Sequence, residues 1–277
     1  MASYQQTVLA DAPILYYRCE ETSGATCNDA SGNGHTGTCH TGFTRNVSMG
    51  PAGLDIGVTL DGTAGTNITT PNSAALNLIV PVSYECWLKW TSATTGVIFS
   101  QGVDTNGGYE WVLFSTGLMT IANAASGTHQ FDQVGGALST GTLYHLVWTF
   151  KTGPDLNTFY INGVSNNTNS TATVVSSTQS TQSFGFGGQM NSGGVQFPLP
   201  ATMDEMAIYN YALSSSQVAA HYAARNTATG SSPASNTAPP GQAIAALAHD
   251  RNLQRKEQEQ PGRRLRISDY HKHRRHG

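Results

Sequence analysis

Short segments rich in aromatic and β-branched residues recur along the chain, and each is bounded by Gly, Asn, Asp or Thr. This pattern predicts β-strands separated by turns. The expected strands are PILYYRCE (13–20), SYECWLKW (83–90), GVIFSQ (96–101), YEWVLFS (109–115), LMTIANA (118–124), LYHLVWTF (143–150), NTFYING (157–163), SFGFGG (183–188) and TMDEMAIYN (202–210). Because many short strands at even spacing are typical of sandwiches and jelly rolls, we expect an all-β fold.

Two local signals predict a turn and a helix. Asn162-Gly163 stands between apolar flanks, which is the usual sequence of a two-residue hairpin turn. In SSSQVAAHYAA, Ser214 and Gln217 have the spacing of a capping box. We therefore predict one short helix over 214–224, after the last strand.

Alternation along two of the strands separates a core face from a second face. The residues expected in the core are Tyr84, Cys86, Leu88 and Trp90, together with Tyr144, Leu146, Trp148 and Phe150. The second face carries Glu85, Trp87 and Lys89 on one strand and His145 on the other. A ring for stacking beside polar groups for hydroxyls is the composition of a sugar-binding face. The alternative is that a neighbouring loop or the second sheet covers Trp87.

The charge distribution divides the chain into regions. Residues 1–240 hold 5 Lys/Arg against 13 Asp/Glu, a balance of −8, whereas residues 241–277 hold 9 against 4, a balance of +5. Between them, NTATGSSPASNTAPPG (226–241) has the Pro, Ser and Gly content of a linker. We predict a folded domain over 1–225, a linker over 226–241 and a basic tail over 242–277.

The basic tail predicts a partner. Its clustered residues are Arg263, Arg264, Arg266, Tyr270, Arg274 and Arg275. We do not expect nucleic acid binding, because the body is acidic and contains no recognised reader fold. A tail of this composition is expected to be disordered alone and to dock on an acidic surface of another protein. The alternative is that it only keeps the terminus soluble.

The four cysteines, Cys19, Cys27, Cys39 and Cys86, contain no CxxC pair, so a zinc ribbon is not predicted. Cys27 and Cys39 flank a glycine-rich segment and could close it as a disulfide. The alternative is that the cysteines are small buried thiols, which suits Cys19 and Cys86 better. The sequence leaves the state of Cys27 and Cys39 open.

The stretch PILYYRCEETSGATCNDASGNGHTGT resembles the opening of laminin-G-like, concanavalin A-like jelly rolls, with its Asp-x-Ser-Gly-Asn-Gly signature. VTLDG (58–62), YECWLKW, YHLVWTF and FYINGV follow in the family's order, and MDEMAIYNYALSSSQVAAHYAA is similar to its closing strand and helix. The resemblance covers about residues 4–225. The chain departs from the family pattern at Cys19, where an aliphatic residue is usual, and at Tyr144, where Trp is usual.

The resemblance also implies a structural calcium site that joins the first and last strands. The residues that would supply oxygen ligands are Glu20, Asp29, Asn33 and Asp204. The alternative is that Asp29 and Asn33 only form Asx turns with their own backbone.

The same fold hosts glycoside hydrolases, which need two carboxyl groups on one face. Asp204 and Glu205 are adjacent, so a regular strand would point them to opposite faces, and Glu85 has no acidic neighbour on its strand. No G-x-S-x-G or H-E-x-x-H motif is present either. We therefore expect no enzymatic activity, with a glycoside hydrolase as a remote alternative.

The sequence also predicts where the protein is found. The first residues lack the basic start and apolar core of a signal peptide, and no apolar run reaches the ~18 residues of a membrane helix. Laminin-G-like modules of this kind occur in bacteriophage virions, notably in minor tail proteins. The sequence is thus interpreted as a virion structural protein, made in the host cytoplasm, present in multiple copies and held to other virion proteins by its tail. It would display a lectin-like domain to host glycans; the alternative is a bacterial carbohydrate-binding or adhesion module.

Overall fold

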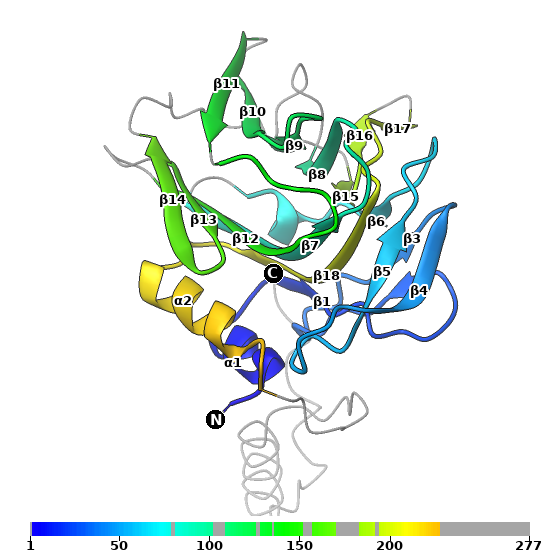
Figure 1. The fold of residues 1–277 in the computed structure, drawn as a ribbon, viewed down its shortest axis with the longest axis vertical. Helices are drawn as coiled ribbons and strands as arrows, with labels where there is room; N and C mark the ends of the chain where they lie inside the picture. The colour runs from blue at the N-terminus through cyan, green and yellow to red at the C-terminus, as the bar shows by residue number, and fades with distance from the viewer. Residues whose placement is uncertain are drawn as a thin grey trace, which may run out of the picture. The chain divides into compact units, whose positions relative to one another are not determined.

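The computed structural model describes residues 2–78, 81–101, 109–125, 128–134, 136–151, 157–169, 183–191 and 194–227 (Figure 1). Two eight-stranded antiparallel sheets, here called sheet A and sheet B, make up most of this part of the chain. The predicted all-β sandwich is therefore confirmed. The linker beyond residue 227 and the basic tail lie outside the described residues.

Sheet A contains both of the strands whose alternation separates a core face from a second face. Strand β1 (Leu15–Tyr17) pairs with β18 beside the main path. That path runs in the order β14 (Val164–Asn169), β13 (Asn157–Ile161), β12 (Leu143–Phe150), β7 (Val82–Trp90), β18 (Ala201–Tyr209), β5 (Ile56–Leu60) and β4 (Phe43–Ser48).

Sheet B faces sheet A, and β16 (Gln189–Asn191) and β17 (Gly194–Gln196) form a separate two-stranded sheet. The order of sheet B is β11 (Thr128–Val134), β10 (Met119–Ala125), β9 (Tyr109–Leu113), β8 (Gly96–Gln101), β15 (Phe184–Phe186), β6 (Ile68–Thr70), β3 (Gly37–Cys39) and β2 (Thr26–Cys27).

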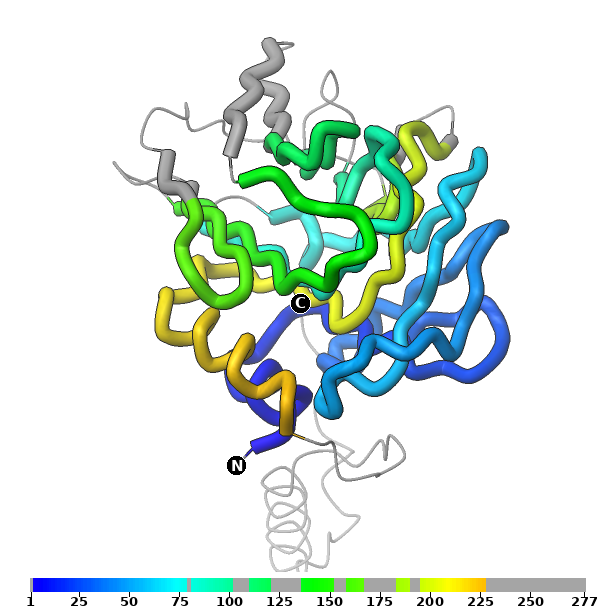
Figure 2. Tube along the Cα trace, viewed as in Figure 1, coloured from blue at the N-terminus to red at the C-terminus, as the bar shows by residue number. Residues whose placement is uncertain are grey.

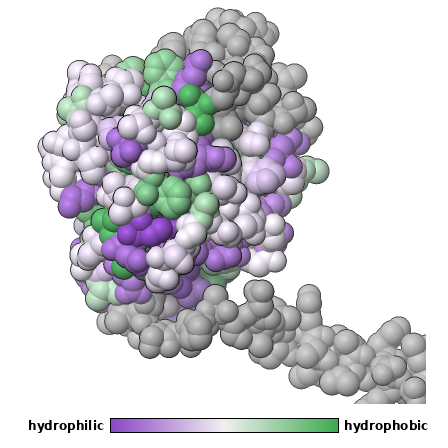
Figure 3. Space-filling view, turned by 90° about the vertical axis from the view of Figure 1, so that its right-hand side faces the viewer, coloured by the Kyte–Doolittle hydropathy of each residue, from purple (hydrophilic) through white to green (hydrophobic). Residues whose placement is uncertain are grey.

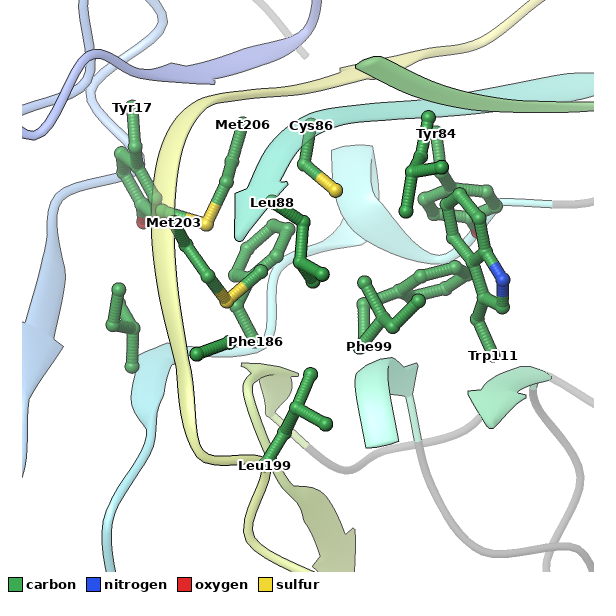
Figure 4. Packing of buried hydrophobic residues seen from close by; sticks show 14 of the residues in the cluster. Tyr17, Tyr84, Cys86, Leu88, Phe99, Trp111, Phe186, Leu199, Met203 and Met206 are labelled. Carbon is green, nitrogen blue, oxygen red and sulfur yellow. The ribbon is translucent and has the colours of Figure 1, made fainter. Parts of the chain in front are cut away.

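The main core lies between the two sheets. In Figure 4, side chains of β7 and β18 in sheet A point toward Phe99, Trp111 and Phe186 of sheet B. The predicted core residues of 83–90 and 143–150 all belong to this cluster, with Tyr144 partly buried at its edge. Tyr84 stacks on Phe99 with ring centroids 3.9 Å apart, so aromatic contacts join the sheets directly.

The first and last strands of the domain are neighbours. Strand β1 pairs with β18 in antiparallel register, with Leu15 opposite Ile208 and Tyr17 opposite Met206. The predicted strand 13–20 is shorter than expected, because Cys19 adopts a positive φ of 54° that bends the chain away. At the other predicted turn, Asn162 and Gly163 have φ values of 53° and 80° and join β13 to β14, which confirms the hairpin.

Two helices cover the outer face of sheet A. Helix α2 (Ser215–Ala224) confirms the prediction, including the capping box of Ser214 with Gln217. Helix α1 (Tyr4–Ala10) was not predicted, although Ser3 and Gln6 form the same motif at its start. The tube in Figure 2 shows the blue N-terminal helix beside the gold C-terminal one. A short 3₁₀ helix, η1 (Ala74–Leu76), completes the described elements.

The surface of the described part is mixed in character. On the face shown in Figure 3, hydrophobic residues lie in small separate groups among hydrophilic and neutral ones. In the part of the chain that the structure describes, no helix has the length and apolar content needed to cross a membrane.

Candidate functional site

Beneath the two helices, the outer face of sheet A carries a buried polar cluster centred on Glu85. Strand β7 directs Glu85 and Trp87 outward, because alternate residues face opposite sides of a sheet. Strand β12 places Val147 opposite Glu85 and His145 opposite Trp87. The predicted grouping of these side chains on one face is therefore correct.

The carboxylate of Glu85 is fully enclosed by hydrogen-bond donors. Its Oε1 accepts bonds from the Tyr4 hydroxyl (3.0 Å) and from His145 Nε2 (2.7 Å). Its Oε2 accepts from the Tyr209 hydroxyl (2.7 Å), and His221 Nδ1 lies 3.0 Å from both oxygens. The donors come from α1, β12, β18 and α2, so this one side chain joins four elements.

His221 connects Glu85 to Asp11, the C-cap residue of α1. Its Nε2 lies 2.9 Å from Asp11 Oδ2, while the imidazole itself is buried. Burial lowers the pKa of His221, but the charge of Glu85 and the hydrogen bonds to Glu85 and Asp11 outweigh this and raise it to about 9. His221 is therefore an imidazolium at neutral pH, held between two carboxylates.

The pKa values of Glu85 and His145 are shifted in ways that fit the charge of His221. Burial acts to raise the pKa of Glu85, yet the charge of His221 and the hydrogen bonds from His145 and His221 lower it below its ordinary value. For His145, burial lowers the pKa despite the bond to Glu85, so this ring is neutral. The result is one ionised Glu85–His221 pair with a neutral histidine donating to it.

A second pair of carboxyl groups, Asp204 and Glu205, lies on the same outer face. The expectation that they point to opposite faces is wrong, because β18 contains a bulge between Asp204 and Ala207 at which Glu205 has a φ of 51°. Asp204 stands opposite the outward-facing Trp87, and Glu205 accepts a hydrogen bond from the hydroxyl of Tyr16.

Both carboxyl groups of this pair are fully buried. Burial raises the pKa of Glu205 to about 8, although Arg18, with Nε 3.6 Å from Oε1, and the Tyr16 bond act to lower it. Burial also raises the pKa of Asp204 well above its ordinary value, and Glu205 adds to the effect. Glu205 is thus mainly protonated at neutral pH, and neither buried carboxyl group can reach a substrate in solution.

The predicted sugar-binding face of Glu85, Trp87, Lys89 and His145 is corrected by the structure. Glu85 and His145 are buried, and Trp87 is 2% exposed; only Lys89 of the four is exposed. The Trp87 ring stacks on Tyr222 of α2 at 5.8 Å and meets Tyr4 of α1 edge-on at 6.2 Å. The helices, rather than a loop or the second sheet, occupy the surface that a sugar ring would need.

The predicted calcium ligands occupy separate environments. Asp29 accepts backbone N–H bonds from Tyr16 and Ser31 through Oδ1 and from His35 through Oδ2, at 2.8–3.0 Å. The side chain of Asn33 donates to the backbone carbonyl of Ile14. The bond from Ser31 to Asp29 is the Asx turn of the alternative interpretation, whereas the Asn33 amide bonds to the backbone of a distant segment and not to that of its own turn.

The two remaining predicted ligands add no ion site. Glu20 pairs with Arg18, and the carboxyl oxygens of Asp204 have no hydrogen-bond partner within the described part of the chain. Among the described residues, no group of three or more His, Cys, Asp or Glu is arranged to hold a metal ion. The residues present therefore do not fit calcium as they stand here, and calcium binding stays a prediction.

The partner-binding residues predicted in the tail, Arg263, Arg264, Arg266, Tyr270, Arg274 and Arg275, lie outside the described residues. Within the domain, the sequence reasoning missed Tyr4, Asp11 and His221 as parts of the Glu85 cluster. The capping box at Ser3 and Gln6 was the available signal for α1, and a histidine on the buried side of α2 was the signal for His221.

The architecture is similar to that of known proteins. Residues 61–219, more than half of the chain, match the family model described as the concanavalin A-like lectin/glucanases superfamily. The chain belongs to this superfamily. No curated protein matches this concanavalin A-like chain.

Several solved structures share the concanavalin A-like fold at low sequence identity. The binding domain of Paraclostridial Mosquitocidal Protein 1 aligns with a TM-score of 0.60 and 14% identity over 77% of this chain and 52% of its own. The binding domain of botulinum neurotoxin DC, in complex with rat synaptotagmin II, gives 0.61 and 13% over 79% and 53%. Trypanosoma rangeli sialidase in complex with sialic acid gives 0.55 and 14% over 77% and 33%. The chain thus spans about half the length of the toxin domains and a third of the sialidase, and at these identities the likeness concerns the fold.

Proposed function

We propose that this chain is a bacteriophage virion structural protein of the minor tail or decoration type. Its concanavalin A-like domain binds glycans of the host surface, and its basic C-terminal tail anchors it to other virion proteins. The observation that carries the proposal is the lectin-like sandwich itself, which belongs to a lectin and glucanase superfamily and whose buried carboxyl groups are not placed for hydrolysis.

The position of the helices supports a division between an anchoring side and a binding side. Helices α1 and α2 lie together on one side of the domain, far from the β16–β17 and β10–β11 hairpins at its opposite end (Figure 1). The last described residues remain attached to the helix side, because Gly53 N–H donates to the carbonyl of Arg225 and Thr227 N–H donates to that of Ala224. The described chain therefore ends on the helix side, away from the hairpins.

Phe197, which follows β17, has the properties of a sugar-stacking residue. Its side chain is 54% exposed, and its φ of 47° is unfavourable for a residue with a side chain. Segment 91–97 runs beside it, because Val97 N–H donates to the Phe197 carbonyl. The exposed hydroxyls of Ser92 and Thr94 therefore lie on the adjoining segment, and Gln196 adds an exposed amide. An aromatic face beside hydroxyl and amide groups suits a sugar ring.

Glycan binding is tested on a glycan array with the full-length protein, followed by Kd measurements for each glycan that binds. We expect Phe197→Ala to weaken binding by roughly tenfold or more, since aromatic stacking of this kind contributes about 1.5 kcal/mol. Val164→Ala is the matched control, because Val164 is 69% exposed on a different hairpin. If no glycan binds the wild-type protein, glycan binding is refuted; if Phe197→Ala binds normally, only the location is wrong.

The anchoring role is tested by truncation after Thr227, which keeps every described helix and strand. We expect purified virions from cells that express only the truncated protein to lack it, while the protein folds with an unchanged melting temperature. Full incorporation of the truncated protein would overturn the anchor and favour a free carbohydrate-binding or adhesion module.

A further inference from the structure

Three of the four cysteines gather at one end of sheet B. Cys27 ends β2 and Cys39 ends β3, and the two strands pair in antiparallel register. Their Sγ atoms lie 3.0 Å apart, and Cys19 forms a side-chain hydrogen bond with Cys27. All three thiols are buried in the main core, whereas Cys86 belongs to β7 in the other sheet.

A fixed guanidinium group faces two of these sulfur atoms. Arg45 Nη2 lies 3.4 Å from Cys27 Sγ and 3.3 Å from Cys39 Sγ. The same nitrogen donates to the carbonyl of Thr26, and Nη1 pairs with Glu21 at 3.0 Å, so the group is held in place from both sides. A cation at this distance stabilises a thiolate, the reactive form of cysteine.

The pKa shifts agree with this geometry. Hydrogen bonds from Cys19 and Cys39, together with Arg45, lower the pKa of Cys27 to about 3, against the opposing effect of burial. The pKa of Cys39 is raised, first by its hydrogen bond to Cys27 and then by burial. For Cys86, burial and the charge of Glu85 both raise the pKa. The attacking sulfur within the group is therefore Cys27.

We propose that Cys27 and Cys39 form a disulfide by exchange with a low-molecular-weight disulfide such as oxidised glutathione. The Cys27 thiolate attacks one glutathione sulfur, forming a mixed disulfide and releasing one glutathione thiolate. Cys39 then loses its proton to solvent and attacks the Cys27 sulfur, which forms the protein disulfide and releases the second glutathione. Two protein thiols are oxidised, and one glutathione disulfide is reduced to two thiols.

The product would close the segment between the two strands. That segment contains Asp29, whose carboxylate already accepts backbone N–H bonds from Ser31 and His35 inside the loop and from Tyr16 outside it. The covalent bond would restrict the unfolded chain and leave this hydrogen-bonded loop unchanged. Because the sulfur atoms are buried in the folded domain, the reaction takes place most readily while the β2–β3 pair is forming.

The test is refolding of the full-length reduced protein in a buffer of reduced and oxidised glutathione, with a parallel sample in reductant alone. Free thiols are then alkylated, and the protein is digested with trypsin and Asp-N. Cleavage after Arg18, before Asp29 and after Arg45 leaves Cys19 and Cys27 on peptide 19–28 and Cys39 on peptide 29–45. The proposal predicts that these two peptides are joined by a disulfide, with Cys19 and Cys86 alkylated.

Thermal unfolding gives a second readout. A loop of this length predicts a melting temperature about 6 to 12 °C higher after oxidative refolding. Cys39→Ser should abolish the oxidant-dependent shift, and the matched Cys86→Ser should keep it. Alkylation of both Cys27 and Cys39 after oxidative refolding would overturn the proposal, as would a closed ring within peptide 19–28, which would show that Cys19 is the partner instead.

Discussion

Replacing Glu85 by Gln tests the structural role of the cluster beneath the helices. The amide keeps the shape of the side chain, and its oxygen can still accept from Tyr4 while its NH2 group can donate to the Tyr209 hydroxyl oxygen. It removes the negative charge that faces His221. His221 then has little reason to stay protonated in a buried site. The variant should therefore lose the free energy by which the folded protein favours the imidazolium.

The size of that loss follows from the pKa of His221. Its pKa rises from an ordinary 6.5 to about 9 in the folded protein, so its contribution to stability is complete below pH 6.5 and is lost as the pH rises through 9. Proton linkage over this range gives about 2.5 kcal/mol at pH 7 and about 3 kcal/mol at pH 6. Because His221 can release its proton in the variant, the loss of stability at pH 7 stays at about 2.5 kcal/mol. This is less than the roughly 3–5 kcal/mol that an unpaired buried charge costs.

The assay is urea unfolding of wild type and Glu85→Gln at pH 6, 7 and 9.5, monitored by tryptophan fluorescence. We expect the variant to be less stable by about 2.5 kcal/mol at pH 7, with the difference falling below about 0.5 kcal/mol at pH 9.5. Lys89→Gln, an exposed change on the same strand, is the control and should leave stability within about 0.5 kcal/mol. A loss that is equal at all three pH values, or absent at pH 7, would refute the reasoning.

Three further results are expected. In the folded protein the pKa of Glu205 is raised from 4.5 to about 8, so its contribution to the free energy of unfolding is present below pH 4.5 and is lost as the pH rises through 8. Urea titrations should therefore show that Glu205→Gln gains stability relative to wild type between pH 5 and pH 9. Gly117→Ala would place a Cβ 2.2 Å from the Leu138 carbonyl oxygen and should lower the melting temperature clearly more than Gly141→Ala, which has a similar φ and open space around it. Because Asp29 is satisfied by backbone N–H groups, EDTA should leave the melting temperature unchanged; a drop reversed by calcium would establish the ion that the sequence predicts.

The strands were predictable from the sequence because their signal is local. Strands β8 and β12 have the predicted bounds, and the Asn162-Gly163 hairpin and the cap of α2 lie where expected. The division of β7 side chains between two faces was also predicted correctly. Side chains of a regular strand alternate between the two faces of a sheet regardless of what packs against them.

The candidate site could not be predicted in the same way, because it depends on contacts between distant segments. Whether Trp87 binds sugar or packs inside depends on α1, which lies about eighty residues away in the sequence and has only seven residues. The orientation of Glu205 depends on a single extra residue in β18, which alternation alone does not reveal. Glu85 had no acidic neighbour on its strand, and its partners come from both ends of the domain.

The central claim is that the helices seal the outer face of sheet A and leave ligand contact to the opposite end of the domain. Hydrogen–deuterium exchange of the full-length protein, with and without a glycan that binds it on the array, tests this most directly. The account predicts new protection of backbone amides in residues 91–97 and 194–199 and unchanged exchange in α1, α2 and β7. Protection confined to β7, or loosening of α1 and α2 on glycan binding, would contradict it.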